Sequence, residues 1–222
     1  MLDKLIPMSK MKEPRKEHAL VRLGMDIYVI GGYNGKAKSF LKSCEKFLIK
    51  ENRWVPIADL ITQRCAFAAT SLNGDKVIVC GGYDGKKRID TIEVYDPKSE
   101  EWKLLELKLP LPLSNLAAFN PYRDHIVILG GGLSTGFYTS VQMLNMKTGE
   151  WSELSAVNYG KDLRNKVIFI NNAAYAFGGN NYSAEKLLID NNKWVAVNPY
   201  DIQNNLDSWS CALTFQLPSA SQ

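Results

Sequence analysis

The residues of this chain that could carry out chemistry are few, and their spacing does not favour catalysis or metal binding. Its two histidines, His18 and His125, are not spaced as metal ligands with each other or with any cysteine. No GxSxG elbow, P-loop or HExxH motif occurs. The sequence therefore predicts no catalytic residue, no metal site and no cofactor.

The cysteines are the remaining candidates for reactive groups. The four of them show no CxxC spacing: Cys44, Cys65, Cys80 and Cys211. They lie in apolar or β-rich runs, where a free cysteine behaves as a small hydrophobic residue. We expect buried, reduced thiols. Redox sensing is the alternative, and only Lys42 and Lys46 near Cys44 would favour a lowered thiol pKa.

Composition indicates an ordinary globular protein. The chain has 222 residues, of which 45% are hydrophobic and 23% charged, so it is long enough to form a substantial core. No apolar run reaches the length of a membrane-spanning helix, and residues 1–14 do not resemble a signal peptide, so we expect a cytoplasmic protein without membrane contact. The net charge of +4 is spread along the chain without a basic stripe, which disfavours nucleic acid as a partner.

The elements that position these residues recur with a fixed period. Double glycines occur at Gly31-Gly32, Gly81-Gly82, Gly130-Gly131 and Gly178-Gly179, at intervals of 50, 49 and 48 residues. Each pair ends an apolar run of strand length, where a backbone with positive φ or a close neighbouring backbone requires residues without a Cβ. Four such pairs in register predict a repeated β unit.

Four tryptophans follow the glycine pairs in phase. They are Trp54, Trp102, Trp151 and Trp194. Between glycines and tryptophan lies a second β-rich run, such as residues 92–95, and before each glycine run lies another strand: residues 18–23, 65–71, 115–120 and 165–170. The predicted unit is a four-stranded antiparallel meander of about 50 residues, which is typical of a propeller blade.

These motifs resemble kelch repeats. GGYNG at residues 31–35, GGYDG at 81–85, EVYDP at 93–97 and the phased tryptophans carry the resemblance, which covers nearly the whole chain. It implies an all-β, kelch-type β-propeller with four four-stranded blades. We expect one domain over residues 1–222, with repeats at approximately 15–58, 64–107, 113–156 and 162–198 and partial blade strands within 1–14 and 205–222.

The two ends of the chain predict an incomplete propeller. Residues 209–216 read as a further inner strand and residues 3–8 as an outer strand, so both ends fall within a blade. Kelch propellers usually have six blades, which at about 49 residues each would need roughly 290 residues. We expect open strand edges and self-association through them, whereas a closed four-blade ring is the alternative.

The resemblance implies a protein-binding surface on the loops of one propeller face. Tyrosine beside positive charge is typical of interaction hot spots, and the net positive charge favours an acidic peptide or protein as the partner. Arginines before the inner strand occupy a position that kelch repeats often use. The residues that we predict to contact a partner are Arg15, Tyr33, Asn34, Lys36, Arg64, Tyr83, Asp84, Lys86, Lys87, Arg88, Tyr138 and Tyr182.

Three functions are compatible with the resemblance. The first is a non-enzymatic protein-interaction module, for instance the substrate receptor of a cullin-type ubiquitin ligase adaptor. The second is an actin or cytoskeletal scaffold. The third is a kelch-type enzyme, such as a sugar epimerase or oxidase, which would need clusters of histidine or inward arginine and glutamate that this sequence does not show.

Overall fold

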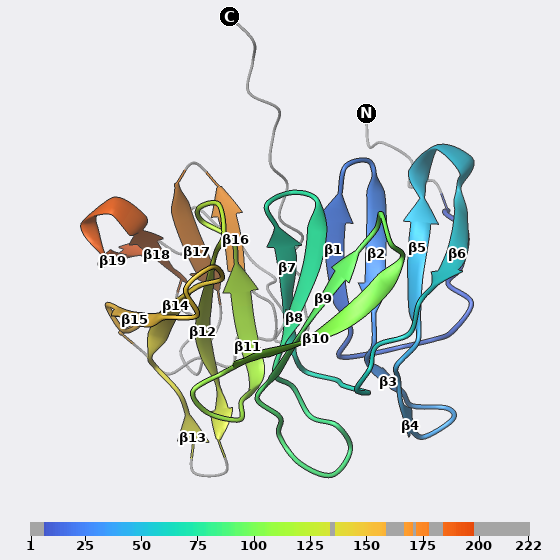
Figure 1. The fold of residues 1–222 in the computed structure, drawn as a ribbon, viewed down its shortest axis with the longest axis horizontal. Helices are drawn as coiled ribbons and strands as arrows, with labels where there is room; N and C mark the ends of the chain where they lie inside the picture. The colour runs from blue at the N-terminus through green and yellow to red at the C-terminus, as the bar shows by residue number, and fades with distance from the viewer. Residues whose placement is uncertain (1–6, 134–135, 159–166, 171, 178–183, 198–222) are drawn as a thin grey trace, which may run out of the picture.

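The protein consists of antiparallel β-sheets joined by loops (Figure 1). The structure is a computed structural model that describes residues 7–133, 136–158, 167–170, 172–177 and 184–197. Helical structure among these residues is restricted to two short 3-10 turns, Ile49–Glu51 and Ile189–Asn191. None of the helices among them is long and apolar enough to span a membrane.

Each predicted repeat forms one four-stranded blade. The first contains β1 (Ala19–Leu23), β2 (Asp26–Ile30), β5 (Cys44–Leu48) and β6 (Arg53–Ile57). The second contains β7 (Ala68–Leu72), β8 (Lys76–Cys80), β9 (Thr91–Asp96) and β10 (Glu101–Lys108). The third contains β11 (Ser114–Phe119), β12 (His125–Leu133), β14 (Val141–Asn145) and β15 (Trp151–Leu154). The fourth contains β16 (Val167–Ile170), β17 (Ala173–Phe177), β18 (Ala184–Leu188) and β19 (Lys193–Val197).

The order of strands in every blade confirms the predicted meander. The strand before the glycine pair is innermost, the glycine strand and the β-rich strand follow, and the tryptophan strand is outermost. Three shorter strands lie in the loops after the glycine strands: β3 (Tyr33–Asn34), β4 (Ser39–Phe40) and β13 (Gly136–Phe137). The all-β propeller architecture expected from the repeats is therefore present.

The hydrophobic core lies between successive blades, because each sheet is apolar on both faces. One cluster joins the first and second blades, with Ile30 and Phe67 fully buried. A second cluster joins the second and third blades, and a third cluster joins the third and fourth. The blades follow one another in a row from blue to red, with the first and fourth at opposite ends (Figure 1).

At the glycine pairs of the first and second blades, one blade approaches the next, as predicted. Gly81 has a φ of +64° and Gly82 a φ of +104°. A Cβ on Gly81 would lie 2.7 Å from the carbonyl oxygen of Leu113, in the connection that leads to the third blade. A Cβ on Gly82 would lie 2.7 Å from Cβ of Phe67 on the inner side of its own blade. Both reasons for glycine, backbone conformation and close packing, therefore apply at one site.

The tryptophans connect each blade to the segment that precedes it. The indole Nε1 of Trp102 donates a hydrogen bond of 3.0 Å to the carbonyl oxygen of Ala58. The equivalent acceptors for the other three tryptophans, Trp54, Trp151 and Trp194, are the carbonyl oxygens of Ser9, Lys108 and Ser155. The predicted structural role of the phased tryptophans therefore includes a repeated hydrogen bond as well as packing.

Some predicted features lie outside the described residues. They are Gly178, Gly179, Tyr182, Cys211, residues 3–6 of the expected outer strand and the whole expected inner strand at 209–216.

Candidate functional site

The loops after the glycine strands of the first three blades gather at one end of the sheets and form the candidate site. The β3–β4 hairpin, the loop between β8 and β9, and β13 all project from the same end of the row of blades (Figure 1). The connections between one blade and the next lie at this end as well, because the strands of each blade alternate in direction. We call this surface the loop face.

Two arginines predicted to contact a partner are buried, so that prediction is wrong for Arg15 and Arg64. The side chain of each has no exposed surface. Arg64 is paired with the buried carboxylate of Glu93 at 2.6 Å, and Arg15 is paired with Glu45 at 2.9 Å. A guanidinium enclosed in this way cannot reach a partner on the surface.

Each arginine donates a hydrogen bond of 2.8 Å to the carbonyl oxygen of the first glycine of the pair in its own blade, Gly31 for Arg15 and Gly81 for Arg64. Arg64 donates hydrogen bonds of 2.8 and 3.1 Å to the carbonyl oxygens of Gly81 and Thr91, on the two neighbouring strands of the blade. The paired Glu93 also accepts hydrogen bonds from the backbone amides of Ile61 and Thr62, in the connection from the first blade. Burial lowers the pKa of Arg64, although the ion pair with Glu93 opposes that shift. The pair therefore joins two blades.

The third blade lacks this pair. The carbonyl oxygen of Leu113 accepts a hydrogen bond from the amide of Gly82, and the carbonyl oxygen of Arg64 accepts one from the amide of Gly32. Leu113 therefore occupies the position before the third blade that Arg64 occupies before the second. Gln142 is paired with Ile128 between β14 and β12, and Glu93 is paired with Val79 between β9 and β8, so Gln142 and Glu93 occupy equivalent positions. An apolar residue and a neutral amide thus replace the arginine and the glutamate together.

The side chains of two other predicted contact residues accept hydrogen bonds from backbone amides of their own loops. The side-chain oxygen of Asn34 accepts hydrogen bonds from the amides of Lys36 and Ala37, both 3.0 Å long. Asp84 accepts bonds of 2.7 Å from Lys86 and Lys87 in the same arrangement. Desolvation acts to raise the pKa of Asp84, but these amide donors outweigh it and the pKa is lowered. Both side chains form Asx turns, and Asn34 is buried, so its predicted contact with a partner is wrong.

The other predicted contact residues differ in exposure. Lys36, Lys86 and Lys87 are exposed, whereas Tyr33, Tyr83 and Arg88 are partly buried. Arg88 donates a hydrogen bond of 3.1 Å from Nε to Ser114 Oγ of the third blade. Tyr138 is partly buried and packs against the core between the second and third blades. The loop face therefore presents lysines around partly exposed aromatic rings.

Sequence reasoning missed Phe40, which joins the loops of two blades. Its ring centroid lies 4.9 Å from that of Tyr33 and 5.6 Å from that of Tyr83. Tyr33, Phe40 and Tyr83 form a continuous aromatic row across the first and second blades. Lys16 Nζ lies 5.5 Å from the centroid of the Tyr33 ring, so a cation stands at one end of the row.

The buried thiols and His18 belong to the framework of the blades. Burial raises the pKa of the Cys44 and Cys80 thiols to about 12, and Cys65 is buried as well. The prediction of buried thiols is confirmed for these three. Desolvation lowers the pKa of His18 to about 4. Its place beside Gly32 corresponds to that of Phe67 beside Gly82, so it occupies a packing position of the blade.

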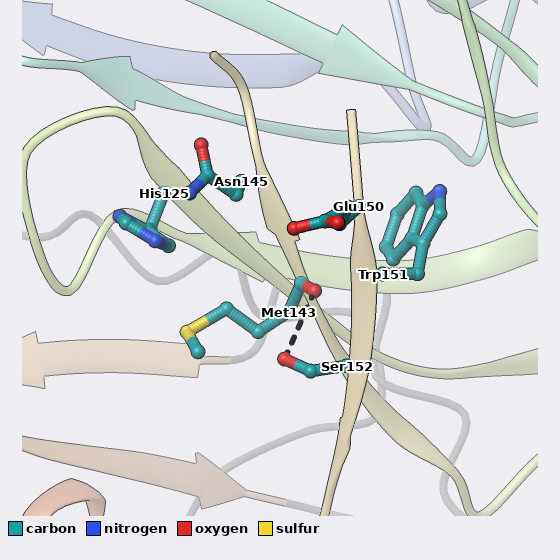
Figure 2. Close-up of a pocket in the computed structure, with 6 residues that line it drawn as sticks. All are labelled: His125, Met143, Asn145, Glu150, Trp151 and Ser152. Carbon is teal, nitrogen blue, oxygen red and sulfur yellow. Dashed lines mark hydrogen bonds between the residues drawn. The ribbon is translucent and has the colours of Figure 1, made fainter. Parts of the chain in front are cut away.

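A hollow of about 360 Å³ lies on the third blade, away from the loop face (Figure 2). It is lined by His125, Met143, Asn145, Glu150, Trp151 and Ser152. Its polar groups bond locally: Nδ1 of His125 contacts the carbonyl oxygen of Arg123 at 2.8 Å, and the Ser152 hydroxyl donates to the carbonyl oxygen of Met143. No cluster of three or more metal-ligating side chains occurs among the residues that the structure describes.

Comparison with known proteins agrees with the geometry. Mouse (Mus musculus) Kelch-like protein 35 is 31% identical over 140 residues, which are 62% of this chain and 23% of that protein. Human (Homo sapiens) Kelch-like protein 23 is 25% identical over 217 residues, 93% of this chain and 37% of that protein. The chain thus spans well under half the length of these relatives. The family model of the KLHDC2/KLHL20/DRC7 Kelch-repeats domain matches residues 3–179, and the chain belongs to the kelch-repeat family.

Proposed function

We propose that this protein is a non-enzymatic interaction module that binds a partner protein or peptide on its loop face. The observation that carries the proposal is the aromatic row of Tyr33, Phe40 and Tyr83 beside exposed lysines on loops of adjacent blades. Aromatic rings in a charged rim are the composition of protein-binding surfaces. The buried arginines, by contrast, support the framework and do not take part.

An acidic partner is favoured by the charges of these loops. Lys36, Lys38, Lys86 and Lys87 are exposed, while the Asp84 carboxylate accepts two backbone amides of its own loop. The accessible charge is therefore mainly positive. Complementary charge increases the rate of association and makes binding sensitive to salt.

The role of such binding in the cell is the finer part of the proposal. We place first the substrate receptor of a cullin-type ubiquitin ligase adaptor, which the resemblance to kelch repeats implies, and the actin or cytoskeletal scaffold second. The two differ in what the bound partner does: a substrate is ubiquitinated and degraded, whereas a cytoskeletal partner co-sediments with filaments.

We expect the double variant Lys86→Ala/Lys87→Ala to bind an acidic partner about three- to tenfold more weakly. Both side chains are exposed, and their removal leaves the Asx turn at Asp84 intact, because that turn uses only their backbone amides. Affinity is measured on purified chain at low and high salt, with thermal unfolding as the check on folding. Wild-type binding should weaken as salt rises.

A matched pair at the other end of the sheets provides the control. Lys98 and Lys103 are also exposed, and the variant Lys98→Ala/Lys103→Ala removes the same charge away from the loop face. If both double variants reduce binding equally, net charge and not the loop face is responsible.

Self-association is a separate expectation. Among the described residues, the first and fourth blades each pack against a neighbouring blade on one side, since core clusters join only successive blades. Apolar sheet faces and unpaired strand edges favour association. We expect concentration-dependent oligomers of the 222-residue chain in analytical ultracentrifugation. A monomer that persists at high micromolar concentration and melts cooperatively would contradict this expectation.

A further inference from the structure

The aromatic row has a cation at each end. Lys16 lies over the outer ring, Tyr33, and its own side chain is exposed. At the other end Arg88 is bridged to Tyr83 through the backbone, and its Nε is held by Ser114 Oγ at 3.1 Å. A lysine thus contacts the first ring of the row, and an arginine is paired through the backbone with the residue that carries the last ring.

The rings are held in place by backbone and packing, so the row exists before any partner binds. Tyr33 and Phe40 face each other across the two-residue strands β3 and β4. Tyr33 also exchanges backbone hydrogen bonds with Lys16, and Tyr83 exchanges them with Cys65. Gly85 packs against the Phe40 ring, since a Cβ placed on Gly85 would lie 2.7 Å from Cδ2 of Phe40. A preformed surface loses little conformational entropy on binding.

The dimensions of the row suit an extended peptide. Adjacent rings are 4.9 and 5.6 Å apart, and an extended or polyproline II chain advances about 3.1 to 3.4 Å per residue, so the three rings extend along about three to four residues. Flat rings in a row contact proline and aliphatic side chains, as in grooves that bind polyproline II segments. The cations at the two ends would then face residues just outside that stretch.

We propose that the aromatic row binds an extended peptide in which a short stretch of proline or aliphatic residues is flanked on both sides by aspartate or glutamate. This proposal rests on the proposed function of the loop face and adds the pattern of side chains that the face selects. The apolar stretch lies on Tyr33, Phe40 and Tyr83, and the flanking carboxylates pair with Lys16 and Arg88. Because both ends must match, a peptide that is acidic throughout or apolar throughout binds less well.

The test is a selection of peptides from a random nine-residue library displayed on phage, with the purified full chain as bait. The expected result is enrichment of proline, leucine, valine or isoleucine at consecutive positions with an acidic residue on each side. Enrichment of uniformly acidic peptides, of peptides without acidic flanks, or of no sequence at all would overturn the proposal.

The selected peptide is then synthesised with a fluorophore and titrated against variants of the row. Phe40→Leu keeps an apolar side chain of similar size but loses the flat ring, and we expect its affinity to fall about tenfold. Gly85→Ala keeps all three rings but displaces Phe40, and should also weaken binding. Tyr122→Leu, at an exposed tyrosine outside the row, should bind as wild type.

Failure of this proposal can be distinguished from failure of the proposed function. If the peptide binds and Lys86→Ala/Lys87→Ala weakens it, while Phe40→Leu and Lys16→Ala/Arg88→Ala do not, the loop face binds partners but the row is not the subsite. If neither set of variants changes binding, both proposals fail. Circular dichroism melting of Phe40→Leu and Gly85→Ala confirms that each variant is folded before its affinity is compared.

Discussion

Replacing Arg64 with leucine is expected to reduce the free energy of unfolding by about 3 to 5 kcal/mol. The change removes hydrogen bonds to the carbonyl oxygens of Gly81 and Thr91 and leaves the carboxylate of Glu93 buried without its cation. Removing one partner of a buried ion pair is costly because the other charge stays in a medium of low polarity. Urea unfolding followed by circular dichroism measures the loss.

The third blade supplies the matched control for this prediction. The double variant Arg64→Leu/Glu93→Gln gives the second blade the residue types that the third has at the equivalent positions, Leu113 and Gln142. It should recover a large part of the loss, because no charge then remains buried alone. The exposed pair of Arg53 and Glu51 should change stability by no more than about 1 kcal/mol when Arg53 is replaced with alanine. A loss below about 1 kcal/mol for Arg64→Leu would contradict the structural role.

Valine at Gly81 or Gly82 is expected to cost at least about 3 kcal/mol. Left-handed backbone strain contributes about 1 to 3 kcal/mol, and the added atoms meet neighbouring groups at 2.7 Å. The neighbours include the backbone carbonyl of Leu113, which cannot move aside without separating two blades. Expression in soluble form and the urea midpoint are the measurements.

Two other glycines separate conformation from packing. Gly24 has a φ of +58°, close to that of Gly81, but nothing lies within 4 Å of a Cβ placed there. Gly24→Ala therefore reports backbone strain only, whereas Gly81→Ala reports strain and the contact with the next blade. Gly35 has neither constraint, so Gly35→Ala should stay within about 0.5 kcal/mol of wild type. Equal stabilities of Gly24→Ala and Gly81→Ala would show that packing between blades is not what the glycine pair serves.

The repeated architecture could be predicted from the sequence because it depends on local requirements that recur. Glycine without a Cβ and tryptophan with a large apolar surface are needed at the same point of every blade. Their period therefore indicated the number and order of strands before any contact was known. The loops between β2 and β5 and between β8 and β9 have no such shared requirement, and their contacts were not predicted.

The site residues were harder to predict because burial and contacts between blades are tertiary properties. Arg15 and Arg64 looked like surface cations, since a sequence does not display the carboxylate that lies 30 or 29 residues further on. A signal did exist at the equivalent positions of the third repeat, where Leu113 and Gln142 replace the arginine and the glutamate together. Phe40 gave no signal, because its contact with Tyr83 joins loops of different blades.

The hydrogen bond from each tryptophan to the segment before its blade also defines interchangeable units. The accepting carbonyls of Ser9, Ala58, Lys108 and Ser155 occupy equivalent places, and Ser9 and Ser155 even share the same second contacts, to Asn52 and Asn192. A recombination between related genes that joins chains just after these residues would carry a complete blade together with the donor that clamps it. The segment that stays before the junction would supply an equivalent acceptor carbonyl, so the hydrogen bond would form again. The segment between blades that accepts the tryptophan hydrogen bond is thus also the position at which whole blades can be duplicated, lost or exchanged during evolution.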